Sequence, residues 1–203
     1  EPIVRAKHAG NTVYAETCPQ YLELTEQDLF RWGPQAKIGP PLRTPSDTVV
    51  LWEGIKNGDI DTVASDHAPK GQRQDEDFFN AGYGSPQAET LLNLVYDGGV
   101  NTGTISLPKL VEVLCENPAR IFGLYPKKGC LEPGSDADIV IFDPTAQHTI
   151  TKETQHSNAG YTLYEGRPCL GRPIMSFQRG NVLLSDNQLH GKPGQGEYLP
   201  RFE

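Results

Sequence analysis

The residues of this 203-residue chain best suited to chemistry lie in a few short polar segments. The sharpest is residues 65–69 (SDHAP), which follows the apolar, strand-like run 61–64. A carboxylate such as Asp66 at the end of a strand can bind a divalent metal ion or hold a proton during a reaction. The alternative is that Asp66 caps the next turn and that His67 is an ordinary polar neighbour. The local sequence leaves both interpretations open.

Two other segments are candidates for a binding site, residues 17–22 (TCPQYL) and 37–43 (KIGPPLR). Gly39 would let a ligand approach the backbone closely, and Pro40 would help to stiffen the loop. A rigid connector without a ligand would look the same. We expect Cys18 to be a structural thiol rather than a nucleophile, because no base lies beside it in the sequence.

The elements that must position these residues change in character along the chain. Strand and helix alternate over the first 125 residues or so, which predicts parallel βα units, and short strands follow. If the units belong to a barrel, functional residues should follow the strands at their carboxyl ends. We expect strands at 12–16, 61–65, 137–142, 147–151 and 161–164, and a hairpin of 174–178 with 181–184 around Gly180.

Helices are expected where a capping residue precedes an apolar pattern. Residues 44–47 (TPSD) start one helix, which Gly58 stops. Its expected buried face consists of Val49, Val50 and Ile55, with Trp52 as a further candidate. A second should start at Ser85-Pro86 and stop at Gly98-Gly99. Others are expected over residues 1–10, 106–116 and 118–123.

Composition limits the class of protein. Hydrophobic residues make up 36% of the chain and charged residues 22%, which is enough for a buried core. A net charge of -8 gives no support to a nucleic-acid partner or an anionic membrane. No apolar run approaches the roughly 18 residues that span a bilayer. The four scattered cysteines predict free thiols in a reducing, cytoplasmic environment.

In this order, a set of segments resembles the cyclic amidohydrolase family, and most of all its dihydropyrimidinase and D-hydantoinase branch. The matching segments are 13–22 (VYAETCPQYL), 39–43 (GPPLR), 64–69 (ASDHAP), 117–129 (NPARIFGLYPKKG), 133–144 (PGSDADIVIFDP) and 191–196 (GKPGQG). The resemblance covers essentially the whole chain. Dihydroorotase and allantoinase are related alternatives within the same family.

The resemblance implies a fold. The family combines a (β/α)8 TIM barrel with a β-sandwich, so residues 1–125 would be the C-terminal part of the barrel, and residues 126–203 a share of the sandwich with an extended tail. Residues 12–16 would be barrel strand seven and 61–65 strand eight. The chain begins with Glu1 and its single methionine is Met175, so we expect an N-terminal part of a larger protein, with the family's other metal ligands, to be absent.

The resemblance also implies a function, the hydrolytic opening of a small cyclic amide or imide. Two divalent ions, usually zinc but with other metals possible, would share a hydroxide. Asp66 would be both a metal ligand and the proton shuttle. Gly39 and Pro40 would hold the substrate through backbone groups. Where the family has an Asn-Gly loop this chain has residues 80–86 (NAGYGSP), so Tyr83 or Gly84 would take that place.

Two other functions stay open. The family includes dihydropyrimidinase-like scaffold proteins that have lost their metal ligands, and the 203 residues could also be a separate binding module. Asp66 favours the enzyme, because a scaffold has no chemical need for it. We expect residues 1–203 to be inactive alone, and the complete enzyme to be a homo-oligomer, with a tetramer as one form.

Overall fold

The structure is a computed structural model that describes residues 2–71 and 75–201. Its α-helices are α1 (Pro2–His8), α2 (Pro19–Glu23), α3 (Asp28–Trp32), α4 (Pro45–Asn57), α5 (Leu91–Val95), α6 (Leu107–Val111) and α7 (Asn117–Ile121). Short 3₁₀ turns are η1 (Gly33–Ala36), η2 (Ala88–Thr90) and η5 (Lys152–Thr154), and π-helical segments are η3 (Tyr96–Asn101) and η4 (Glu112–Glu116). The strands are β1 (Glu16–Thr17), β2 (Thr62–Val63), β3 (Ile139–Ile150), β4 (Arg167–Gln178), β5 (Asn181–Ser185) and β6 (Gln188–Leu189).

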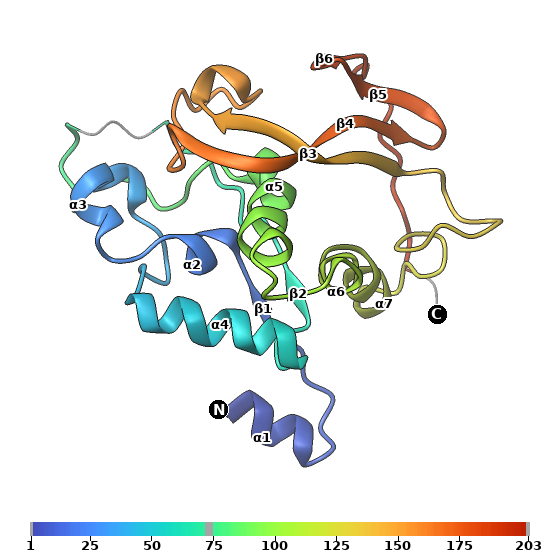
Figure 1. Cartoon of the computed structure of the whole chain (residues 1–203), viewed down its shortest axis with the longest axis horizontal. Coiled ribbons are helices and arrows are strands. Elements are labelled where there is room, and N and C mark those ends of the chain that lie inside the picture. The colour runs from blue at the N-terminus through green and yellow to red at the C-terminus, as the bar shows by residue number, and fades with distance from the viewer. Residues whose placement is uncertain (1, 72–74, 202–203) are drawn as a thin grey trace.

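The strands form two separate sheets. β1 and β2 pair in parallel, as the alternation of strand and helix predicted, although each is only two residues long. β3, β4, β5 and β6 form an antiparallel sheet in sequence order. Figure 1 shows this sheet on one side of the molecule, with α5 between it and α4. The chain is therefore an α/β structure followed by an antiparallel sheet.

The ends of α4 are those that the sequence predicted. Thr44 and Asp47 form a capping box, and Gly58 ends the helix in the left-handed region with a φ of 82°. The predicted buried face is only partly right. Ile55 is fully buried, whereas Val49 and Val50 are 62% and 68% exposed. At 3.6 residues per turn these two valines point about 120° and 140° away from Ile55, so they cannot share its buried side.

The predicted stop at Gly98-Gly99 is wrong, because the helical segment that contains α5 continues through η3 to Asn101. The chain leaves it at Gly103, whose φ is +76°. Gly99 serves close packing instead, since a Cβ there would lie 2.7 Å from the Trp52 ring. Both glycines are needed for space and not for termination. The helices expected over 106–116 and 118–123 are present as α6 with η4 and as α7.

The antiparallel sheet corrects two further expectations. Asp143-Pro144 does not end a strand, because β3 runs on to Ile150 with a register shift between Asp143 and Gln147. A proline is tolerated at such an irregularity, where a ladder hydrogen bond is already missing. Residues 161–164 form a buried turn rather than a strand. The hairpin around Gly180 is confirmed, with Gln178 paired to Asn181.

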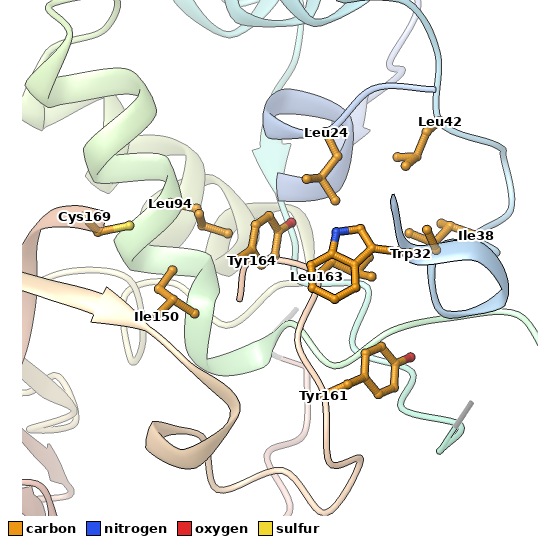
Figure 2. Close-up of a cluster of buried hydrophobic side chains, with 11 residues drawn as sticks. Leu24, Trp32, Ile38, Leu42, Leu94, Ile150, Tyr161, Leu163, Tyr164 and Cys169 are labelled. Atoms are coloured by element: carbon orange, nitrogen blue, oxygen red, sulfur yellow. The ribbon is translucent and has the colours of Figure 1, made fainter. Parts of the chain in front are cut away.

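The core has two parts that meet at α5. One cluster lies between α4, β2, α5 and α6, and includes Ile55, Val63 and Val95. The other joins the segment from Leu24 to Leu42 with α5 and the antiparallel sheet. Figure 2 shows Leu163 and Tyr164 of the buried turn among the side chains of this second cluster. It contains residues from both sides of the predicted domain boundary at 125/126, and that division stays a prediction.

Charged and polar groups also join the α/β part to the sheet, at what we call the helix–sheet interface (Glu23, Gln87, Asp97, Tyr164 and Arg167). The Arg167 guanidinium lies 2.5 Å from the Glu23 carboxylate and 3.6 Å from that of Asp97. The Tyr164 hydroxyl donates to Gln87 Oε1 at 2.9 Å. Burial raises the pKa of Glu23, although Arg167 opposes that shift. These contacts hold the antiparallel sheet against α2 and η3.

In the part of the chain that the structure describes, no helix has both the length and the apolar character needed to cross a membrane.

Candidate active site

The candidate site begins where the two parallel strands end. Glu16 pairs with Thr62 and Thr17 with Val63, so the chain leaves both strands at the same edge. Cys18 follows β1 directly, and Asp66 comes three residues after the end of β2. Parallel pairing therefore brings together two segments that lie far apart in the sequence.

A cavity of about 470 Å³ opens at this edge. Its lining residues come from β1 and α2, the loop after Ile38, the first half of α4 and the segment after β2. They are Glu16, Thr17, Cys18, Tyr21, Gly39, Pro40, Pro41, Arg43, Asp47, Thr48, Leu51 and Asp66. The structure thus places Asp66, Gly39 and Pro40 around one cavity. Tyr83 and Gly84 are not among its lining residues.

Asp66 has an unusual backbone conformation, and a side chain on α2 fixes its carboxylate. Its φ is +50°, in the left-handed region that few residues other than glycine adopt, and its side chain is exposed. Gln20 Nε2 donates a hydrogen bond to Asp66 Oδ2 at 2.9 Å. The hydrogen bond of the Asp66 side chain is thus made across to α2 and not to the turn that follows, which argues against the capping interpretation.

His67 has a structural role beside this carboxylate. Its Nδ1 accepts hydrogen bonds from the backbone N–H groups of Gln87 and Ala88, each at 3.0 Å. Nδ1 is therefore the unprotonated nitrogen of the ring. The imidazole ties the segment after β2 to the start of η2, and so fixes the chain next to Asp66.

Cys18 lines the cavity but is poorly suited to act as a nucleophile. Burial, and then the negative charges of Asp66 and Glu16, raise the pKa of its thiol to about 12. The thiolate is the reactive and metal-binding form of cysteine, and almost none of it exists near neutral pH at such a pKa. This agrees with the expectation of a structural thiol.

Tyr21 connects the two walls of the cavity. Its hydroxyl donates to the carbonyl oxygen of Pro40 at 2.9 Å. Burial, together with the charge of Asp66, raises the pKa of Tyr21 to about 12, so the hydroxyl remains a donor. The bond holds the Gly39–Pro40 backbone against the segment after β1. The sequence predicted segment 17–22 as a candidate for the binding site but gave Gln20 and Tyr21 no individual role. Their position directly after a strand was the available signal.

Tyr83 stands next to Gly39, outside the cavity lining. A Cβ on Gly39 would lie 3.3 Å from the Tyr83 ring, so the ring occupies the space that a side chain at position 39 would need. Lys37, only 8% exposed, lies beneath this ring with its ammonium group 4.7 Å from the ring centre. The same ammonium donates to the carbonyl oxygens of Phe79 and Ala81, at 3.0 and 2.7 Å. Lys37 thereby fixes the loop that carries Tyr83 and Gly84.

The donor set can be tested against a divalent metal ion. Within residues 2–71 and 75–201 no three His, Cys, Asp or Glu side chains are grouped so as to hold a metal. The Asp66 carboxylate fits as one ligand, because it is exposed at the cavity and Gln20 occupies only Oδ2. Any complete metal site would need ligands from outside these residues.

Comparison with known proteins identifies the family. The model of the amidohydrolase family matches residues 35–180. An L-hydantoinase of Paenarthrobacter aurescens is 38% identical over 99% of this chain, and a D-hydantoinase of Streptomyces coelicolor is 38% identical over 98% of it. The crystal structure of the dihydropyrimidinase from Brevibacillus agri NCHU1002 superposes on 98% of the chain with a TM-score of 0.94 and 38% identity.

The chain spans about half the length of these relatives, covering 45%, 44% and 45% of them. The resemblance predicted from the motifs is confirmed over the whole chain, and so is similarity in fold to dihydropyrimidinase. The chain belongs to the amidohydrolase family.

Proposed function

We propose that the protein containing this sequence is a metal-dependent hydrolase that opens the ring of a cyclic amide or imide, of the dihydropyrimidine or hydantoin type. The observation that carries the proposal is the place of Asp66, an exposed carboxylate at the carboxyl end of a strand, with one oxygen fixed and the cavity beside it. The relatives' names, L-hydantoinase, D-hydantoinase and dihydropyrimidinase, support the same class of substrate.

In this proposal Asp66 has two tasks, as ligand and as proton carrier. The chemistry that divalent ions supply when bound, zinc by the family resemblance, is activation of water and polarisation of the ring carbonyl. Asp66 takes the proton that the attacking water loses and delivers it to the ring nitrogen. The amide nitrogen is a poor leaving group until it is protonated, so a single carboxylate that performs both transfers is economical. Gln20 keeps Oδ2 in place while this happens.

The Gly39–Pro40 segment would hold the substrate. Backbone N–H and C=O groups suit an imide edge, which offers alternating acceptors and donors. Tyr21 fixes the carbonyl of Pro40, and the Tyr83 ring packs close to Gly39. We propose that Tyr83 and Gly84 act on substrate choice through this loop and not as part of the cavity wall. Residues 12–16 and 61–65 would be the last two strands of the barrel.

The decisive test is turnover by the full-length protein together with its metal content. We expect about two zinc ions per subunit by elemental analysis, and ring opening of dihydrouracil or hydantoin. Dihydroorotate and allantoin in the same assay separate the two alternative activities of the family. A protein with no bound metal and no turnover of any of the four compounds would be a scaffold instead.

Two smaller proposals accompany this one. Residues 1–203 alone, supplied with zinc, should show no turnover, because the described residues contain no group of three side chains that could hold a metal ion. Turnover by this piece would refute our account of the missing ligands. The full-length protein should be an oligomer, with a tetramer expected, and light scattering coupled to size exclusion measures this directly.

A further inference from the structure

Gln20 is buried at the cavity in an arrangement that the fold itself does not need. Its side chain is 0% exposed, and its residue lies on α2 next to two other buried residues, Pro19 and Leu22. Its Nε2 faces Asp66 Oδ2 across 2.9 Å. The direction of the amide is fixed, because a carboxylate only accepts hydrogen bonds and must be met by the NH₂ group.

The other end of the amide is left unsatisfied. Gln20 Oε1 is buried and has no hydrogen-bond partner among the described residues. A buried acceptor without a donor destabilises the fold, whereas an apolar side chain of the same volume would not. The amide therefore lowers stability at Oε1, and what it provides in return is the contact with the exposed carboxylate of Asp66.

Asp66 needs such a contact. Its side chain is exposed and its backbone is in the left-handed region, so local structure does little to select one side-chain orientation. The hydrogen bond from Gln20 holds Oδ2 and thereby limits the orientations that the carboxylate can take beside the cavity. Groups that orient a metal-binding side chain in this way affect metal affinity and activity by 10- to 100-fold when they are removed.

We infer that Gln20 is the positioning residue of Asp66, and that it is retained for the site at the expense of stability. This inference rests on the proposed function for its catalytic consequence. Its structural part, the orientation of the Asp66 carboxylate, does not depend on turnover.

The test replaces the amide by an apolar side chain of similar size, Gln20→Met, in the full-length protein. We expect the Kd for zinc, measured by competition with a chelator, to rise about 10- to 100-fold and kcat to fall by a similar factor. KM should change less than about threefold, because Gln20 is not among the residues that line the cavity. The Tm should stay unchanged or rise, since the unsatisfied oxygen is gone.

Gln87→Met is the matched control. Gln87 is also a buried glutamine, 2% exposed, with one amide atom unsatisfied, but its bonded atom accepts from Tyr164 rather than from a site residue. This variant should lower the Tm and leave zinc affinity and kcat within about twofold. If Gln20→Met does not fold, Gln20→Leu serves the same purpose.

The inference is overturned if Gln20→Met keeps zinc affinity and kcat within twofold of the parent. A parent protein without metal or turnover would instead remove the proposed function. In that case crystal structures of the metal-free parent and of Gln20→Met decide about Gln20, because the Asp66 side chain should change its rotamer only in the variant. An unchanged Asp66 rotamer would contradict the positioning role.

Discussion

At the cavity, an exposed aspartate with a positive φ is fixed by one buried amide whose other end is unsatisfied. At the helix–sheet interface the carboxylates are paired instead. Glu23, whose side chain is only 9% exposed, forms an ion pair with Arg167. Asp97 also pairs with Arg167, at 3.6 Å, and accepts a hydrogen bond from the backbone N–H of Leu170. Paired charges stabilise a contact between two parts of the chain. The Asp66 carboxylate, which Gln20 holds through Oδ2, can use its other oxygen to bind a metal ion or carry a proton. Substitutions at the cavity should therefore lower activity, whereas substitutions at the helix–sheet interface should lower stability.

The largest effect is expected for Asp66→Asn in the full-length protein. Asparagine keeps the shape, tolerates the positive φ and still accepts from Gln20, but it carries no negative charge and cannot take a proton. We expect kcat to fall about 10³-fold, with the free energy of unfolding within about 0.5 kcal/mol of the parent. Glu153→Gln, at an exposed carboxylate of η5, is the control. Activity within tenfold of the parent would exclude Asp66 as the proton carrier.

Arg167→Met should lower stability and leave the residues around the cavity in place. It leaves Glu23 and Asp97 without their cation, which we expect to cost about 3 kcal/mol of unfolding free energy because Glu23 is largely buried. The exposed pair of Lys56 with Glu53 provides the control, since Lys56→Met should change stability by less than about 0.5 kcal/mol. Equal effects of the two substitutions would show that the interface is held by apolar packing alone.

The pH dependence sharpens this prediction. The pKa of Glu23 is raised in the folded state, so its contribution to stability is present below its unfolded value and is lost as the pH rises through the folded value. Without Arg167 the folded pKa should be higher still. The part of the Arg167→Met deficit that comes from Glu23 should therefore shrink as the pH is lowered below about 4.3, where Glu23 is mostly neutral in both the folded and the unfolded state. Chemical denaturation of the parent and of Arg167→Met at several pH values measures this difference in unfolding free energy.

Gly99→Ala tests packing beneath the same interface. The new methyl group would lie 2.7 Å from the Trp52 ring and 2.9 Å from Ile105 Cγ1, so these side chains or the backbone must move. We expect a loss of about 2 kcal/mol in stability with kcat unchanged. Gly196→Ala has open space around it and should be neutral. A neutral Gly99→Ala would contradict the close packing of this glycine against Trp52 and Ile105.

The smallest effect is expected for Lys37→Met, which should change both stability and substrate binding slightly. It removes the donor to the carbonyls of Phe79 and Ala81 and the cation beneath Tyr83. The loss should be about 1 kcal/mol in stability, with faster amide hydrogen exchange confined to residues 77–84. KM should rise more than kcat falls if this loop acts on substrate choice. Exchange unchanged in the loop would contradict the role of Lys37.

The sequence predicted best what depends on neighbouring residues. The capping box at Thr44 and the left-handed Gly58 fixed both ends of α4, because these signals act on backbone groups within one turn. The motif order indicated the family, and the position of Asp66 after an apolar run indicated the strand end. The misplaced stop at Gly98-Gly99 shows the limit, because the role of Gly99 depends on the Trp52 and Ile105 side chains that pack against it. The exposure of Val49 follows instead from the helical period, which places it away from Ile55.

By itself, then, the sequence determined the family, the order of strands and helices, and the candidate carboxylate. Only the tertiary structure decided which groups meet that carboxylate and its loop: Gln20 reaches Asp66 from 46 residues away, and Lys37 reaches Ala81 from 44. No local pattern encodes such contacts. They arise because parallel pairing and the burial of two apolar clusters bring distant segments together. The polar groups that lie between those segments must then form hydrogen bonds with one another or remain unsatisfied.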